Sequence, residues 1–353
     1  MSPMTPGIRS VAAGLLCLLV LACGGPTPVP ASESPRSAAP SSPPSAAAPS
    51  SPAAVTEPRP PACAEATLAF DPGTETTLLL NCVDQLDTAS IEQVWSWDGT
   101  AWTLVDDGGP PATVVAGVAF DPERNAAVRY GGLPMDGNDC TTETWEWRPA
   151  GWAQIEADPP TACDHMFVVH DALRDVSVLF GGGDADGNLL TETWGWDGSA
   201  WRELASEGPS GRAHFGFVYE AAHEQALLYG GYDGSAVFDD FWSWDGSAWS
   251  RLDFSGPGPR SHLGLAAGDD GLLLFAGASG PSTFNSLGDD TWFLTDGRWN
   301  EVAGDGPSTR GSPAMGYDEA RDVFVLHGGF RADGALLGDT WEWAGTWRCV
   351  SGC

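Results

Sequence analysis

The chain alternates short apolar runs with polar turns, and residues 164–208 show the pattern most clearly. Two apolar runs flank a polar turn there, and two segments with alternating aromatic side chains follow around Asp197-Gly198. Asp-Gly between such segments is typical of a two-residue hairpin turn. No stretch of adequate length has a helical period, so the pattern predicts four antiparallel strands. The expected strands are His165–His170, Val176–Gly182, Thr193–Trp196 and Ala200–Leu204.

This aromatic segment recurs six times, and all 17 tryptophans of the chain stand in it. The first tryptophan of each unit is Trp95, Trp145, Trp194, Trp242, Trp292 or Trp341. The second apolar run of each unit ends in Asn81-Cys82, Gly131-Gly132, Gly181-Gly182, Gly230-Gly231, Ala276-Gly277 or Gly328-Gly329. An acid stands two residues before the first tryptophan in five units, at Glu143, Glu192, Asp240, Asp290 and Asp339, with Gln93 in the first unit. A fixed period of about 49 residues indicates a repeat architecture.

This pattern resembles the kelch repeat: an apolar strand ending in Gly-Gly, then an acid, an aromatic strand and a later tryptophan. The resemblance covers residues 63–353. This region is similar to the central domain of galactose oxidase. It implies an all-β fold, a six-bladed β-propeller with four antiparallel strands per blade around a central channel. A lone sheet with two aromatic faces cannot be soluble, so we expect the tryptophans to form the core between blades.

The N-terminus has the pattern of an export signal followed by a linker. Residues 1–22 carry one cation, Arg9, before the apolar run Val11–Ala22, which is too short to span a bilayer comfortably. The sequence V-L-A-C-G around Cys23 resembles a bacterial lipobox, which implies lipidation of Cys23. Residues 23–62 are rich in Pro, Ala and Ser, which predicts a disordered tether. We therefore expect an exported protein, lipid-anchored at the outer membrane or cell surface; an ordinary secretory signal or an uncleaved anchor is the alternative.

The charge of the chain restricts its partners. Its formal net charge is −32, and all 16 of its cationic side chains are arginines. Nucleic-acid binding needs clustered basic groups, so we expect none. We expect a monomer that meets the membrane through its N-terminal lipid alone.

Six cysteines remain in the repeat region, which after an export signal indicates disulfides. Cys140 and Cys163 stand in loops expected on the same face, which favours a bond between them. If Phe70 pairs with Glu75 across its turn, Cys63 lies opposite Cys82, and Cys349 is left to pair with Cys353. A bond between Cys63 and Cys353, clasping the ring, is the open alternative.

Candidate binding residues cluster just before the first strand of several units. Arg212, Arg260 and Arg310 occupy one repeat position, and His214, His262 and His165 stand at a nearby one. The loops from fourth to first strand and from second to third strand share this face of a propeller. A ring of guanidinium groups there would bind a carboxylate in bidentate fashion. The alternative is that these arginines belong to the scaffold of the repeat.

Other chemistry is less well supported by the sequence. Asp184, Asp186, Asn188 and Glu192 have oxygen atoms at a spacing suited to Ca²⁺, but the pattern occurs in one unit, so we expect a polar turn. We predict neither a metal nor a cofactor, because the histidines are scattered and Cys-x-x-Cys pairs are missing from the sequence. Our leading hypothesis is a binding scaffold that recognises a protein or glycan through the loop face. The alternative is an enzyme acting on an anionic sugar, similar to a sialic-acid epimerase.

Overall fold

The computed structural model describes residues 58–82, 91–253, 256–302 and 304–353. The expected signal peptide (1–22), the lipidation residue Cys23 and most of the linker 23–62 lie outside these residues. Within the described part, no helix has the length and apolar character needed to cross a membrane. The account below therefore concerns the compact unit Glu57–Cys353.

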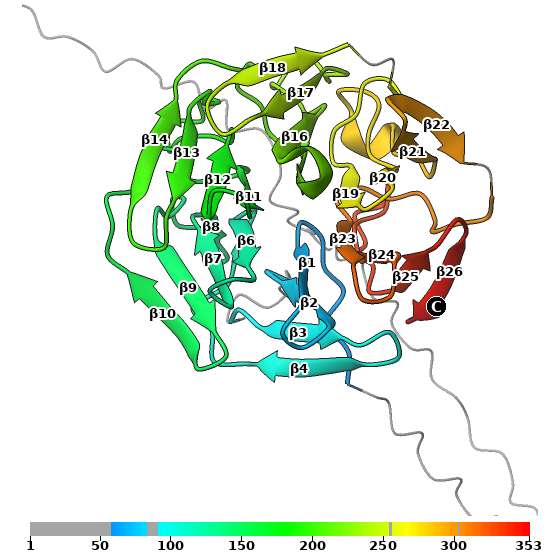
Figure 1. Ribbon diagram of the computed structural model, residues 1–353, viewed down its shortest axis with the longest axis horizontal. Helices are drawn as coiled ribbons and strands as arrows, with labels where there is room; N and C mark the ends of the chain where they lie inside the picture. Colours follow the sequence, from blue (N-terminus) through cyan, green and yellow to red (C-terminus); the bar gives the residue numbers. More distant parts are fainter. Residues whose placement is uncertain (1–57, 83–90, 254–255, 303) are drawn as a thin grey trace, which may run out of the picture. The chain divides into compact units, whose positions relative to one another are not determined.

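Six four-stranded antiparallel sheets form a six-bladed β-propeller, which confirms the predicted fold (Figure 1). Blade one comprises β1 (Thr67–Asp71), β2 (Thr76–Leu80), β3 (Val94–Trp97) and β4 (Trp102–Asp106). Blade two comprises β6 (Gly117–Asp121), β7 (Ala126–Tyr130), β9 (Thr144–Arg148) and β10 (Gly151–Ile155). Blade three comprises β11 (Phe167–Asp171), β12 (Val176–Phe180), β13 (Thr193–Trp196) and β14 (Trp201–Ala205).

The other three blades repeat this meander. Blade four comprises β15 (Gly216–Glu220), β16 (Gln225–Tyr229), β17 (Phe241–Trp244) and β18 (Trp249–Leu252). Blade five comprises β19 (Gly264–Gly268), β20 (Gly271–Phe275), β21 (Thr291–Thr295) and β22 (Arg298–Val302). Blade six comprises β23 (Ala314–Asp318), β24 (Val323–His327), β25 (Thr340–Trp343) and β26 (Trp347–Ser351). The short strands β5 (Thr113–Val114) and β8 (Leu133–Pro134) pair with each other, and η1 (Ala221–His223) and η2 (Thr283–Asn285) are single 3₁₀ turns.

The Asp-Gly turns form the outer hairpins as predicted. In blade three, the Asp197 carboxylate accepts the backbone N–H groups of Ser199 and Ala200 at 3.0 and 2.9 Å. Gly198 has φ +85°, a conformation that a side chain would strain. The same arrangement recurs in blade one and blade four, which explains why the dipeptide recurs in the sequence.

The tryptophans form the core between neighbouring blades, also as predicted. Trp97, Trp196 and Trp244 are fully buried. Each hydrophobic cluster combines residues from adjacent blades; one of them packs Val128 of blade two against Leu179 and Trp196 of blade three. Stacking the sheets therefore removes from water the aromatic surface that a lone blade would expose.

The last tryptophan of a blade donates its indole N–H to a threonine of the preceding blade. The four bonds, 2.8–2.9 Å long, are Trp102–Thr340, Trp201–Thr144, Trp249–Thr193 and Trp347–Thr291. The buried indole nitrogens of Trp152 and Trp299 have no acceptor among the described residues. Their partner position holds Val94 and Phe241, whose side chains carry no acceptor atom. One residue of the repeat therefore decides whether this bond forms.

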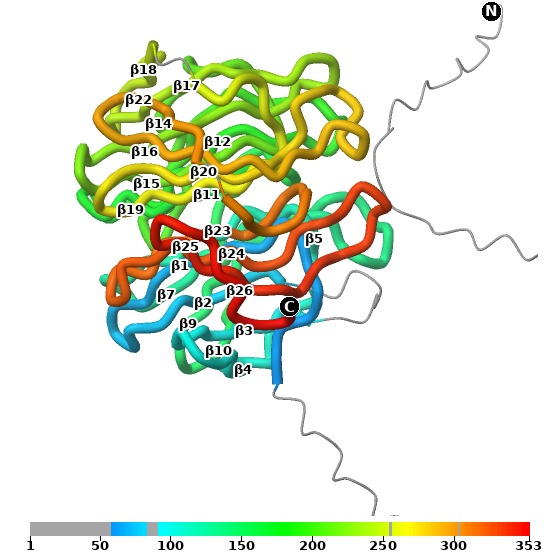
Figure 2. Tube along the Cα trace, turned by 90° about the vertical axis from the view of Figure 1, so that its right-hand side faces the viewer, coloured from blue at the N-terminus to red at the C-terminus, as the bar shows by residue number. Residues whose placement is uncertain are grey.

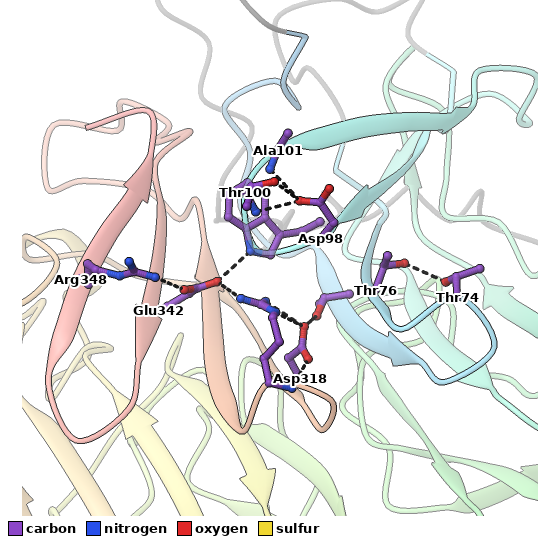
Figure 3. Close-up of polar contacts among 11 residues, drawn as sticks. Thr74, Thr76, Asp98, Thr100, Ala101, Asp318, Glu342 and Arg348 are labelled. Atoms are coloured by element: carbon purple, nitrogen blue, oxygen red, sulfur yellow. Dashed lines mark hydrogen bonds and ion pairs between the residues drawn. The ribbon is translucent and has the colours of Figure 1, made fainter.

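Blade six packs against blade one, and this junction closes the ring (Figures 1 and 2). The indole–threonine bond is present here as at other junctions. The Glu342 carboxylate accepts the indole N–H of Trp97 at 3.0 Å and a guanidinium N–H of Arg348 at 2.8 Å (Figure 3). Asp318 accepts the hydroxyl of Thr77 at 3.1 Å. Each blade is contiguous in sequence, so side-chain packing and these polar contacts close the ring rather than an exchanged strand.

Several strand expectations need correction. The strand predicted at Val176–Gly182 ends at Phe180, because Gly181 and Gly182 adopt φ +70° and +80°, and the strand predicted at Ala200–Leu204 is Trp201–Ala205. The strand predicted at His165–His170 begins at Phe167, because His165 adopts a left-handed conformation with φ +54° and bonds to the neighbouring blade instead. Phe70 pairs with Thr77 rather than with Glu75. The last pair before the turn is Asp71 with Thr76, so residues 72–75 form a longer turn than the predicted pairing requires. Within it, Asp71 accepts the N–H of Gly73 at 2.8 Å.

Three disulfides are formed: Cys63–Cys82, Cys140–Cys163 and Cys349–Cys353. Their Cα–Cα distances are 5.4, 5.6 and 6.1 Å, within the range that a disulfide spans. These are the pairs that the sequence favoured. The alternative clasp between Cys63 and Cys353 is not formed, since each of these cysteines bonds to a nearby partner.

Candidate functional site at the channel mouth

One residue of each blade, two positions before its innermost strand, adopts a left-handed backbone conformation. These residues are Glu65, Val115, His165, His214, His262 and Ser312, with φ between +45° and +60°. We call them the mouth ring. Such a conformation is uncommon for residues other than glycine, and especially so for a β-branched residue such as Val115. Its recurrence in all six blades shows that the surrounding structure imposes it.

Backbone hydrogen bonds join members of the mouth ring across the blade boundaries. The N–H of His262 donates to the carbonyl of His214 at 2.8 Å, and the N–H of Ser312 donates to the carbonyl of His262. Glu65 donates to Ser312 at 3.1 Å across the closing junction, and His165 donates to Val115 at 3.0 Å. The left-handed turn thus aims each N–H at the neighbouring blade and fixes the backbone from which each side chain projects.

The polar side chains of the mouth ring contact one another. Glu65 Oε1 lies 3.4 Å from His214 Nδ1. The imidazole of His214 stacks on that of His262 with centroids 3.7 Å apart, and the ring of His165 meets His214 edge-on at 4.5 Å. About a fifth of the side-chain surface of Glu65, His165 and His214 is exposed. Three imidazoles and one carboxylate therefore form a half-buried cluster that solvent reaches.

The environment shifts the pKa of each of these groups. Burial lowers the pKa of His262, and the positive charges of His214 and His165 add to this effect. Burial and the charge of His165 also lower the pKa of His214, against the opposing contact with Glu65. For His165, burial is outweighed by the Asp164 carboxylate, 3.2 Å away, and by Glu65, so its pKa is raised. Two neutral imidazoles thus lie beside one that is readily protonated.

Glu65 supplies the negative charge of the cluster. Burial raises the pKa of its carboxyl group, but the hydrogen bond to His214 and the charges of His214 and His165 outweigh burial. The pKa of Glu65 therefore lies below its ordinary value, and the group is ionised at neutral pH. Pairs of titratable groups whose environments push their pKa values apart are typical of functional sites.

The cluster stands at one end of the central channel. A cavity of about 330 Å³ runs along the innermost strands of all six blades, and its lining includes Glu65, His165 and His214. Beyond this mouth the innermost strands contribute apolar side chains such as Leu68 and Val168, and the opposite end adds His170, Tyr219 and Glu319. Small-ligand sites usually combine apolar walls with a few convergent polar groups, and the mouth offers such a set.

The arginines predicted at this mouth lie elsewhere. Arg310 is fully buried in its own blade, where two of its guanidinium nitrogens donate to the two carboxylate oxygens of Asp339 at 2.8 Å. It also donates to the backbone carbonyls of Ser308 and Gly328, both at 2.9 Å. Asp339 in turn accepts the indole N–H of Trp341 at 2.6 Å. The recurrent acid before the first tryptophan is therefore the partner of the recurrent arginine.

The other two arginines are held in the same way. Arg212 is 1 % exposed and donates to both oxygens of Asp240, at 2.5 and 3.0 Å. Arg260 pairs with Asp290 in blade five. None of the three arginines is among the described residues that line the cavity. The expected ring of guanidinium groups is thus replaced by three separate clamps inside blades, which is the scaffold alternative.

Of the predicted site residues, the structure brings His165, His214 and His262 together and adds Glu65 and Ser312, which the sequence analysis missed. A signal was present: all five stand at one repeat position, two residues before the first strand of their blade. Glu65 and Ser312 differ in residue type from the histidines at this position, so the recurrence of histidine alone does not indicate them. The Asp184 carboxylate accepts the N–H groups of its own loop, from Asp186 at 3.0 Å and Asn188 at 2.8 Å, as a polar turn does.

The described residues contain one potential metal-ligand group at the mouth. Glu65, His214 and His262 each offer a ligand atom, and these atoms lie within 4.8 Å of one another. A second group, Asp121, His170 and Asp175, lies apart from the mouth ring, at the far ends of β6 and β11. The chemistry available at the mouth is thus metal ligation, proton transfer, and charge pairing through protonated His165.

No family model matches the chain, and no curated protein matches it either. Among solved structures, it is similar to the one described as "Structure of YjhT", with a TM-score of 0.65 and 16 % sequence identity. The match covers 82 % of this chain and 98 % of that chain. At this level of identity, the similarity supports the propeller fold and carries nothing about the ligand.

Proposed function

We propose that this protein is a membrane-tethered, extracytoplasmic binding protein of the kelch type. Its loop face recognises a glycan or protein, and the mouth ring holds the group of that ligand that enters the channel. The observation that carries the proposal is the mouth ring itself: six strained backbone positions, one per blade, present a carboxylate and three imidazoles at a cavity. Strained backbone positions of this kind are frequent at binding sites.

Anchoring and export are part of this proposal. The lipobox-like sequence around Cys23 and the Pro/Ala/Ser-rich linker would hold the propeller away from the membrane. The three disulfides are compatible with an oxidising compartment, because such bonds persist outside the cytoplasm. Replacing Cys23 with Ala should release the protein from the membrane fraction; an unchanged fractionation would reject the anchor.

A glycan and sugar-acid binding screen on the full-length protein in detergent tests the ligand assignment. His165→Ala is the informative variant, because its imidazole is the mouth group most readily protonated and hence the cationic partner for an acidic sugar. His223→Ala is the matched control, since His223 is 71 % exposed on a turn outside the channel. We expect His165→Ala to weaken binding of an acidic glycan at least tenfold and His223→Ala to leave it unchanged. Equal binding by both variants would contradict the proposal.

An enzyme acting on an anionic sugar is the second candidate, and the presence of Glu65 and His165 on the same cavity favours it. Ionised Glu65 and protonated His165 are a proton acceptor and a proton donor on one small cavity, as a sugar epimerase requires. Exchange of the anomeric forms of N-acetylneuraminate, followed by NMR, tests this. Acceleration by the wild type and its loss in Glu65→Gln would establish an enzyme; an uncatalysed exchange rate would leave the binding function as it stands.

A further inference from the structure

We propose that Glu65, His214 and His262 bind one divalent transition-metal ion, of the class of Zn²⁺, at the channel mouth. This deepens the proposed function and rests on it, since the ion would be the group to which the ligand binds. The three residues come from blades one, four and five, so the closed ring is needed to assemble the site.

The distances suit such an ion. Zn²⁺ bonds imidazole nitrogen and carboxylate oxygen at about 2.0–2.2 Å, so two ligand atoms of a tetrahedral site lie about 3.3–3.5 Å apart. Glu65 Oε1 and His214 Nδ1 are 3.4 Å apart. The ligand atom of His262 lies within 4.8 Å of both. Its imidazole stacks on that of His214 at an interplanar angle of 19°, so it would have to turn out of this stack to bind the same ion.

Neighbouring groups orient the imidazoles as they do in metal sites. Nδ1 of His262 lies 3.1 Å from the Ser261 hydroxyl, which leaves Nε2 free to bind an ion. Outer hydrogen bonds of this kind fix the orientation of a ligating histidine. His165, whose Nδ1 faces Asp164, stands beside the ion position without being one of its three ligands. It would contact whatever occupies the fourth coordination position.

The donor set selects the class of metal. Two imidazoles and one carboxylate suit Zn²⁺ and its transition-metal neighbours, whereas Ca²⁺ and Mg²⁺ require six or more oxygen ligands, including water. Three protein ligands leave one position open, the arrangement found in zinc sites that bind a further molecule. Glu65 and His214 line the channel cavity, so the open position would lie at its mouth.

The test uses the full-length protein in detergent, stripped with a chelator and dialysed against ZnCl₂. We expect one zinc per chain by elemental analysis and saturable binding by calorimetry. His214→Ala, His262→Ala and Glu65→Gln should each weaken that binding at least about 100-fold, while His223→Ala leaves it unchanged. Co²⁺ in place of Zn²⁺ should give visible d–d absorption typical of a tetrahedral site, lost in His214→Ala.

Three outcomes would overturn the metal site: less than a tenth of a zinc per chain, the same affinity in all variants, or competition by millimolar Ca²⁺. Thermal unfolding of each stripped variant, compared with the stripped wild type, separates loss of a ligand from loss of the fold. The ligand screen with His165→Ala, run on stripped protein, distinguishes the two proposals. Glycan binding that depends on His165 without zinc would show that the ion is not the group to which the ligand binds, and it would keep the binding function.

Discussion

Two features recur from blade to blade. One is a set of buried polar pairs, the arginine–aspartate clamps within blades and the indole–threonine bonds between them, which we together call the clamps. The other is the mouth ring, and the two features differ in whether the side chain or the backbone is kept. The indole–threonine bonds and the arginine–aspartate pairs use the same residue types in each blade where they occur. The mouth ring keeps its backbone, with φ +45° to +60° in every blade, while its side chains change from carboxylate to valine, imidazole and hydroxyl. The clamps therefore specify stability, and the mouth ring is free to specify a ligand.

Physical reasons support this division. A clamp buries a charged or polar group, so replacing one partner leaves the other uncompensated in the protein interior. The Glu65, His165 and His214 side chains are about a fifth exposed at the end of the channel, so replacing one of them should cost less folding energy than breaking a fully buried pair. We therefore expect substitutions in the clamps to lower the free energy of unfolding and substitutions in the mouth ring to change it little. Four experiments test this expectation.

Arg310→Ala should have the largest effect on stability. It leaves the Asp339 carboxylate buried without its bidentate partner, a change that costs about 3–5 kcal/mol. Urea denaturation should show this loss, and Arg331→Ala, at a side chain 54 % exposed, should differ from wild type by less than about 0.5 kcal/mol. A cost for Arg310→Ala below about 1 kcal/mol would show that the clamp does not stabilise the blade.

His327 contrasts a scaffold histidine with those of the mouth ring. Burial lowers its pKa to about 4, against weaker opposing effects that include the charge of Asp339. The unfolded chain binds this proton near pH 6.5, so stability is complete above that pH and falls as the pH drops toward 4. The loss is about 3 kcal/mol in total. His327→Phe, which installs the residue of the equivalent position Phe180, should flatten this part of the pH–stability curve; an unchanged slope between pH 6.5 and 4 would contradict the assignment.

The indole–threonine bond can be removed in one blade and added in another. Thr144→Val should cost about 1–3 kcal/mol, because it leaves the buried N–H of Trp201 without an acceptor. Val94→Thr supplies an acceptor to Trp152, which packs against Val94, and should stabilise the protein by up to about 1 kcal/mol. Paired unfolding curves measure both. Opposite signs are expected, and a loss in both variants would show that shape, rather than the hydrogen bond, decides this position.

Val115→Asn should have the smallest effect. Asparagine tolerates the left-handed backbone that strains valine, and this gain opposes the loss of apolar surface at Val115, which is 8 % exposed. The net change in stability should therefore be less than about 1 kcal/mol. Val118→Asn, three residues on at a buried position of β6, is the matched control and should cost more than about 2 kcal/mol. Similar losses in the two variants would mean that the mouth ring is part of the core and would remove the basis of the comparison.

Most of the fold could be predicted from the sequence, since the period of the tryptophans sets the number of blades and the Asp-Gly turns set the outer hairpins. The boundaries of the innermost strands could not. His165 reads as the first residue of an apolar run, yet its backbone bonds to Val115 of another blade. A contact between residues of different blades cannot be predicted from the local pattern. The alternation of apolar and polar residues predicts each strand separately and contains no information about the neighbouring blade.

The sequence by itself determined the repeat, the aromatic core and the recurrence of arginine, acid and histidine at fixed positions. The tertiary structure decided what those recurrences do. Arginine and acid within one repeat meet inside one blade, because both flank strands of the same sheet. Histidines of successive repeats meet at the channel, because ring closure converts a period along the chain into a circle. Glu65, 149 residues before His214, contacts it for the same reason. Residues far apart in the sequence can thus lie close together at the channel mouth, and Glu65 and His214 meet only because the ring is closed.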